Sequence, residues 1–116
     1  MAQFILLLHE SGGTGSDLSP EEMQAIIAEY SAWSQKMGEA GKVLDGKKLT
    51  NDAGKVLRTG GGGMAVTDGP YSETKELIGG LFLIEAPDYA AAVEIAGTCP
   101  HAKYGSAIEV RQIDNV

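Results

Sequence analysis

Two short segments of the chain are apolar at every position. Residues 4–8 read Phe-Ile-Leu-Leu-Leu and residues 81–84 read Leu-Phe-Leu-Ile. A strand with one face in water alternates apolar and polar side chains, so a strand that is apolar throughout has both faces covered. Both segments are too short to cross a bilayer, which takes about 20 residues of helix. We predict two central strands of a sheet, and we expect His9 and Glu10 to end the first.

A long amphipathic helix is predicted between residues 20 and 40. Ser19 can accept hydrogen bonds from backbone amides, Pro20 suits the first helical position, and Glu22 completes a capping box. Gly38 and Gly41 are expected to close the helix. Apolar residues recur at helical spacing and predict a stripe on one face, made of Met23, Ile26, Ile27, Tyr30, Trp33 and Met37. Because Tyr30 and Trp33 lie on this stripe, core packing is favoured over the lining of a pocket.

The remaining elements have weaker patterns. We predict a strand over 43–49, a hairpin of 55–59 and 64–67 around four glycines, a helix over 89–96, and a strand over 107–113. Asp88 should cap the second helix and Gly97 should end it. The sequence Cys99-Pro100-His101 predicts a turn.

The resulting order, β-α-β-(hairpin)-β-α-β, predicts an α+β, ferredoxin-like fold in one domain spanning 1–116. In such a sheet the spatial strand order is 4-1-3-2, which makes the two doubly apolar strands central. Two helices can cover only one face of the sheet, and a second copy of the chain is the simplest cover for the other. We therefore expect a homodimer that buries either Phe4, Leu6 and Leu8 or their neighbours Ile5 and Leu7.

Composition narrows the classes of function. Nine basic against sixteen acidic residues give a net charge of −7, which argues against direct nucleic-acid binding. The glycines of residues 11–16 complete neither a phosphate-binding loop nor a dinucleotide fingerprint, so we expect a linker and no cofactor. The lone Cys99 suits a reducing cytoplasm and is expected to be a small buried residue rather than a nucleophile. No targeting or membrane-spanning segment is recognisable, and we expect a cytoplasmic protein.

The segment after the hairpin concentrates polar chemistry. Asp68 precedes Gly69-Pro70, which sets the backbone, and Tyr71, Glu73 and Lys75 follow. Asp68 is the candidate catalytic acid or base, and its alternative role is to accept hydrogen bonds from the turn. Tyr71, Glu73 and Lys75 are candidate ligand-binding residues. For Glu73, Lys75 and Glu76 the alternative is a solvated charged stretch.

The chain has two histidines, and both are candidate ligand-binding residues. His9 ends the first strand and His101 precedes the last, so in antiparallel neighbours they should lie at the same end of the sheet. We expect the polar loop to start from the opposite end. Two histidines without a clear third ligand do not predict a metal site, and the alternative is that they are ordinary rim or surface residues.

Several motifs resemble the DGPF branch of the YCII-related proteins. They are Thr67-Asp68-Gly69-Pro70-Tyr71, Glu73-Thr74-Lys75-Glu76, Gly79-Gly80, Phe82-Leu83-Ile84-Glu85, Cys99-Pro100-His101 and Ile108-Glu109-Val110-Arg111. Tyr71 occupies the position of the phenylalanine that gives the family its name. The resemblance covers nearly the whole chain and implies a dimeric α+β barrel built from two ferredoxin-like halves.

The resemblance leaves two functions open. Some YCII-related proteins are lyase-like or dehydrochlorinase-like enzymes that act on small aromatic compounds with a His-Asp pair, whose histidine lies on the first helix. Residues 20–40 of this chain contain no histidine. The first hypothesis is a dimeric small-molecule-binding protein or lyase-like enzyme with a site around Asp68. The alternative is a non-catalytic interaction module associated with sigma-factor-dependent transcription, because some DGPF proteins are encoded beside or fused to sigma factors.

Overall fold

The computed structural model describes residues 1–11, 18–68 and 76–115. Its elements follow the predicted order, with one short helix added before the last strand. They are β1 (Ala2–Ser11), α1 (Pro20–Glu39), β2 (Val43–Lys48), β3 (Val56–Gly60), β4 (Gly63–Thr67), β5 (Glu76–Ala86), α2 (Tyr89–Thr98), α3 (His101–Tyr104) and β6 (Ala107–Gln112).

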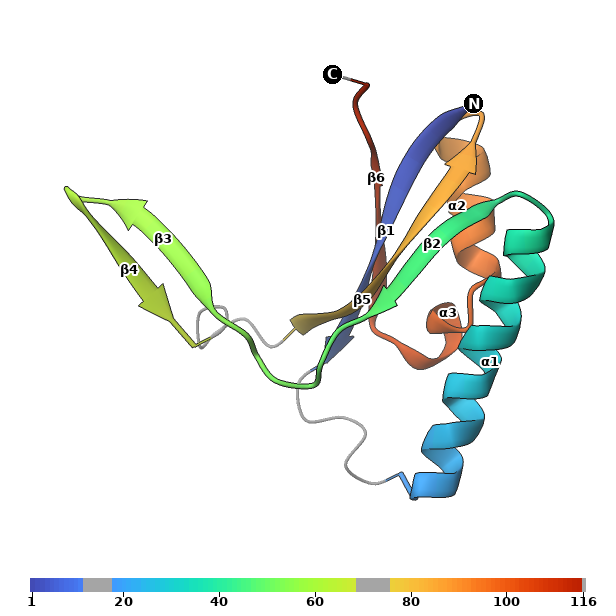
Figure 1. Cartoon of the computed structure of the whole chain (residues 1–116), viewed down its shortest axis with the longest axis horizontal. Helices are drawn as coiled ribbons and strands as arrows, with labels where there is room; N and C mark the ends of the chain where they lie inside the picture. The colour runs from blue at the N-terminus through green and yellow to red at the C-terminus, as the bar shows by residue number, and fades with distance from the viewer. Residues whose placement is uncertain (12–17, 69–75, 116) are drawn as a thin grey trace.

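Four strands form one antiparallel sheet in the order β2-β5-β1-β6 (Figure 1). This is the predicted ferredoxin-like arrangement, and the two doubly apolar strands, β1 and β5, are its central pair. The strands β3 and β4 form a separate two-stranded sheet, which confirms the predicted hairpin. The α+β fold class expected from the pattern is therefore confirmed.

The predicted helix starts are confirmed in their hydrogen bonds. The Ser19 hydroxyl accepts from the Glu22 amide at 3.1 Å, and the Glu22 carboxylate accepts from the Ser19 amide at 3.2 Å. The Asp88 carboxylate accepts from the Ala91 amide at 2.9 Å. Along α1, Ile27 departs from the predicted stripe, since it is 43% exposed.

Three predicted boundaries were wrong. The strand β1 does not end at His9 and Glu10 but continues to Ser11, because the start of β5 pairs with it through backbone groups that do not depend on side-chain polarity. The helix α2 passes through Gly97 to Thr98, whose hydroxyl donates to the Ile95 carbonyl at 2.7 Å. The predicted turn at residues 99–101 opens α3 instead. Its first bonds go to the Pro100 carbonyl, and a proline is well suited to the start of a helix.

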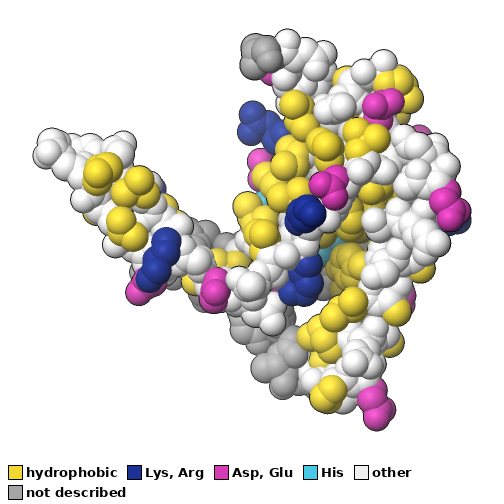
Figure 2. All heavy atoms as spheres, in the orientation of Figure 1, with side chains coloured by type: hydrophobic (Ala, Val, Ile, Leu, Met, Phe, Trp, Pro, Cys, Tyr) yellow, Lys and Arg dark blue, Asp and Glu magenta, His cyan; other side chains and the backbone are white. Residues whose placement is uncertain are grey.

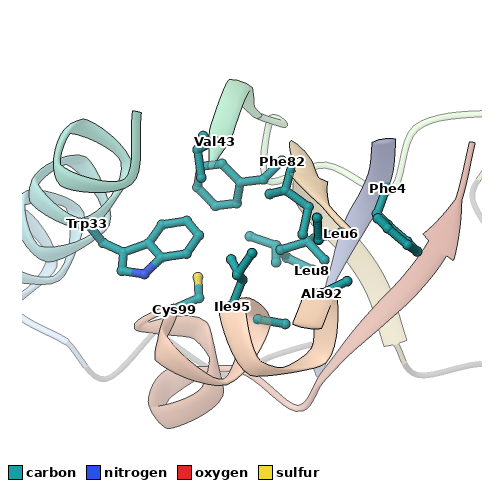
Figure 3. Close-up of a cluster of buried hydrophobic side chains, with 12 residues drawn as sticks. Phe4, Leu6, Leu8, Trp33, Val43, Phe82, Ala92, Ile95 and Cys99 are labelled. Atoms are coloured by element: carbon teal, nitrogen blue, oxygen red, sulfur yellow. The ribbon is translucent and has the colours of Figure 1, made fainter. Parts of the chain in front are cut away.

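The core lies between the sheet and the helices (Figure 3). Its largest contributions from β1 are Phe4, Leu6 and Leu8, which are 0–5% exposed. The Trp33 ring of α1 meets the Phe82 ring edge-on, with centroids 5.0 Å apart, and its indole N–H donates to the Thr98 hydroxyl at 2.9 Å. Core packing of Trp33, as predicted, is confirmed.

The other face of the sheet carries a second apolar surface, formed by Ile5 and Leu7 of β1 and their cross-strand partners Leu83 and Leu81 of β5. All four side chains are half-buried. The helices α1, α2 and α3 lie on the opposite side (Figure 1), so no described helix covers these four residues. We call them the open sheet face. Of the two sets predicted for a dimer contact, Ile5 and Leu7 are the ones without a helix over them.

The hairpin β3–β4 projects away from the four-stranded sheet (Figure 1). Gly61 and Gly62 form its turn with φ of 57° and 83°, the left-handed values that a tight two-residue hairpin turn requires. One of its faces exposes the apolar side chains that Figure 2 shows on this arm, namely Leu57, Met64 and Val66, which are 58–73% exposed.

Across the described residues, no helix has the length and hydropathy that a membrane span needs.

Candidate functional site

His101 is buried on the helix side of the sheet, with 2% of its surface exposed. Its Nε2 lies 2.7 Å from the carbonyl oxygen of His9, and its Nδ1 lies 2.9 Å from the Tyr30 hydroxyl. A carbonyl can only accept, so Nε2 carries the hydrogen and donates it to His9. In the neutral ring, Nδ1 then accepts from Tyr30. Both ring nitrogens are satisfied within the core, which gives His101 a structural environment.

The surroundings of His101 explain why it fits there. The helix α3 starts directly after α2 and brings the ring against the end of β1. A Cβ atom on Gly105 would lie 2.0 Å from His101 Nε2, so a residue with a side chain at this position would displace the ring. The Ser106 hydroxyl also donates to the His9 carbonyl, at 3.1 Å.

The side chain of His9 points to the opposite side of the sheet. Its Nε2 lies 3.1 Å from Oε1 of Glu109 on β6. The register places Glu109 opposite Leu7 and His9 opposite Ala107, so the His9–Glu109 pair borders the open sheet face. Arg111 follows on the same face of β6, with Nη1 4.0 Å from Oε2 of Glu109.

This pair has the chemistry of a general acid or base. A carboxylate beside an imidazole orients the ring and fixes which ring nitrogen carries the hydrogen. The His9 side chain is 22% exposed and that of Glu109 is 43% exposed, so a bound molecule can reach both. Sequence reasoning missed Glu109. Two features of the sequence could have found it. Residues 107–113 alternate apolar and polar side chains, which places Glu109 on the polar face of the last strand, and the predicted strand order places that strand beside the first.

The prediction that the two histidines lie at the same end of the sheet is confirmed, because the His101 ring bonds the His9 backbone. The expectation that the polar loop starts from the opposite end was wrong. The strand β5 is antiparallel to β1, so its first residue, Glu76, pairs with Ser11, and Ile78 pairs with His9. The chain therefore enters β5 at the same end of the sheet as both histidines.

Asp68 lies at the end of the hairpin and forms an ion pair with Lys55. The two side chains are 83% and 71% exposed. Solvent screens such a pair, so it contributes about 1 kcal/mol or less to folding. Tyr71, Glu73 and Lys75, the other candidates from the polar loop, lie outside the described residues.

A shallow pocket of about 250 Å³ lies on the helix side, between α2, α3 and β6. Its lining consists of small and apolar residues with His101 among them. Among the described residues there is no group of three or more histidine, cysteine, aspartate or glutamate side chains that could hold a metal ion.

Cys99 is 2% exposed, which confirms the expected burial. Burial raises the pKa of its thiol, while a hydrogen bond with the His101 backbone opposes this effect in part. The thiolate is the nucleophilic form, so burial makes Cys99 a poor nucleophile.

Comparison with known proteins gives the family. The model of the YCII-related domain matches residues 3–115, and this chain belongs to that family. It is 30% identical over 112 residues to the uncharacterized protein R00369 of Rhizobium meliloti (strain 1021), covering 95% of this chain and 90% of that protein.

A solved structure shares the fold. It is 5-chloro-2-hydroxyhydroquinone dehydrochlorinase (TftG) from Burkholderia phenoliruptrix AC1100, in complex with 2,5-dihydroxybenzoquinone. The superposition has a TM-score of 0.50 and 19% sequence identity, and it covers 98% of this chain and 95% of that one. At this identity the likeness establishes a common fold.

The burial of Tyr30 predicts a stability effect at high pH. Burial, the largest cause, raises the pKa of Tyr30 from 10.0 to about 12. Between these values the tyrosine of the unfolded chain loses its proton while the folded one keeps it. Tyr30 therefore contributes stability that is complete below pH 10 and declines as the pH rises toward 12.

Urea unfolding of the wild type and of Tyr30→Phe from pH 9 to 11.5 measures this effect. The stability advantage of the wild type over the variant is expected to shrink as the pH rises. A stability advantage of the wild type that stays constant over this pH range would contradict the raised pKa of Tyr30.

Proposed function

We propose that this protein is a small-molecule-binding, lyase-like enzyme whose acid–base pair is His9 and Glu109. The observation that carries the proposal is the 3.1 Å hydrogen bond between these side chains at the edge of the open sheet face. At this place a proton acceptor, an orienting carboxylate and an apolar surface lie together. A general base needs this combination near an organic substrate.

The arrangement suits an elimination. His9 takes a proton from the substrate, the electrons of the broken bond form a new double bond, and the leaving group departs with its bonding pair. Glu109 stabilises the imidazolium that forms. Residues 20–40 contain no histidine, so a histidine-based reaction in this chain depends on His9 or His101. His101 is the poorer base, because its ring is buried and both nitrogens are bonded.

The relatives support a ligand class. The dehydrochlorinase that shares the fold is named for a chlorinated hydroxyhydroquinone and holds 2,5-dihydroxybenzoquinone. Hydroxylated aromatic compounds are therefore the first molecules to test on this chain. The names of the relatives give no support to the alternative of a transcription-linked interaction module.

The proposal also assigns ligand contacts to the polar loop, through Tyr71, Glu73 and Lys75, and an acid–base role to Asp68. Chain continuity supports this assignment. Lys75 directly precedes Glu76, and Glu76 pairs with Ser11, two residues beyond His9. The sequence Thr67-Asp68-Gly69-Pro70-Tyr71 further supports membership of the DGPF branch, and a single buried cysteine supports a cytoplasmic location.

We further propose that the chain forms a homodimer, and through it an α+β barrel, by pairing open sheet faces. Four half-buried apolar side chains on the two central strands support this proposal, because a contiguous apolar surface favours burial against a partner. In this assembly the His9–Glu109 pair of each copy borders the interface.

Ligand binding tests the proposed site directly. The probes are 2,5-dihydroxybenzoquinone and chlorinated hydroxyhydroquinones, added to the folded chain and followed by calorimetry and by turnover. His9→Gln is expected to weaken binding at least about 10-fold, since hydrogen bonds to charged groups contribute about 1.5–3 kcal/mol. Asp68→Asn is expected to keep the melting temperature and to lower turnover by about 10²-fold.

The matched control is Glu94→Gln, which removes a carboxylate from the exposed surface of α2 on the helix side. It should leave binding and turnover unchanged. If none of the probes binds the wild type, or if His9→Gln binds them as well as the wild type does, the proposed site is wrong. Full turnover in Asp68→Asn would exclude a catalytic role for Asp68 and leave only its structural role in the turn.

The dimer has its own test. Leu7→Glu places a charge on the open sheet face and is expected to give a monomer in sedimentation at micromolar concentration, because burying an unpaired charge costs several kcal/mol. Leu57→Glu on the hairpin, where the side chain is 58% exposed, is the control and should remain dimeric. A wild-type protein that sediments as a monomer would refute the dimer.

A further inference from the structure

A polar cluster inside the core fixes the backbone of His9 from the helix side. The carbonyl oxygen of His9 accepts from His101 Nε2 at 2.7 Å, from the Ser106 hydroxyl at 3.1 Å and from the Ser106 amide at 3.2 Å. We propose that His101 is the positioning residue that places the His9 side chain beside Glu109. This inference rests on the proposed function, which assigns the chemistry to His9.

The backbone at His9 lies at an irregularity of the sheet. The pairing of β1 with β5 shifts register between Leu8 and His9. A register shift of this kind breaks the regular ladder and re-aims the side chains next to it. The bond from His101 is the shortest of the three at this carbonyl and comes from a ring with little room to move.

The geometry of a strand links the two sides of the sheet. A carbonyl lies near the plane of the sheet, while the side chain of the same residue projects from it. The hydrogen bonds that hold the His9 carbonyl on the helix side therefore fix the direction in which the His9 side chain leaves the other side of the sheet. That direction brings Nε2 to 3.1 Å from Glu109.

The His101 ring is itself closely held. It is 2% exposed, the Tyr30 hydroxyl holds Nδ1 at 2.9 Å, and Gly105 offers no space for even a methyl group. Because the ring lies on the helix side, it acts through His9 and does not touch a ligand on the open sheet face. A role in core packing alone would give the same burial but would not require the bond to His9.

The composition of the chain makes this distinction measurable. Its only histidines are His9 and His101, so in any His101 variant every histidine signal in an NMR spectrum belongs to His9. His101→Gln keeps an N–H donor near the position of Nε2, whereas His101→Phe keeps the ring shape and loses the donor. The readout is the ring N–H proton of His9, which exchanges slowly with water while it is bonded to Glu109.

We expect His101→Gln to keep the His9 ring N–H signal and His101→Phe to lose it through exchange at least tenfold faster, with both variants folded by their amide spectra. Adding Glu109→Gln to the His101→Gln variant gives the reference, because it shows the His9 ring N–H signal when the hydrogen-bond partner of His9 is changed. With any bound probe, affinity should follow the same order, Gln above Phe.

A second pair of variants covers the case in which His101→Phe does not fold. Gly105→Ala pushes a methyl group into the His101 ring, while Gly97→Ala adds the same methyl group to α2 where no heavy atom lies within 4 Å. Gly105→Ala is expected to lose the His9 ring signal, and Gly97→Ala is expected to keep it.

Retention of the His9 ring signal at the wild-type exchange rate in His101→Phe or in Gly105→Ala would overturn the proposal. Equal loss of the signal in His101→Gln and His101→Phe would also overturn it, because the donor would then not matter. The NMR readout needs no ligand. A failure of every probe to bind therefore counts against the proposed function, while the ring signal still decides the positioning role.

Discussion

The structure depends on one constraint, which is that β1 and β5 are apolar on both faces. Burial of one face against α1 and α2 builds the core around Phe4, Leu6 and Phe82. The same sequence pattern leaves Ile5, Leu7, Leu81 and Leu83 on the other side, where no described helix covers them. A strand pair of this kind cannot satisfy both faces with two helices, so the open sheet face follows from the fold itself.

The end of β1 joins this constraint to chemistry. At His9 the pairing of β1 with β5 shifts register, and this one residue makes contacts on both sides of the sheet. Its carbonyl is bonded to the buried His101, and its side chain is bonded to Glu109 beside the open sheet face. The two histidines thus divide their roles by burial, because the ring of His101 is buried in the core and the ring of His9 is the more accessible one.

The sequence predicted the topology well because periodicity reports burial. The doubly apolar strands, the Ser19 capping box and the hairpin glycines each have a local cause, and each is confirmed. The His9–Glu109 pair was missed because residues 100 positions apart meet only through strand register, which no local pattern specifies. The wrong placement of the polar loop came from strand direction, since an antiparallel β5 must begin where β1 ends. Asp68 drew interest through its motif, yet its described environment is an exposed ion pair with Lys55.

The proposed function depends on ligand binding beside His9 and Glu109, at the edge of the open sheet face. The most direct measurement is a crystal structure of the chain grown with a hydroxylated aromatic compound such as 2,5-dihydroxybenzoquinone. The expected result is a ring at the edge of the open sheet face, with one of its oxygens within hydrogen-bond distance of the His9 side chain. Density for the compound in the helix-side pocket near Gly105 and Ser106, with the region beside His9 and Glu109 empty, would contradict this proposal.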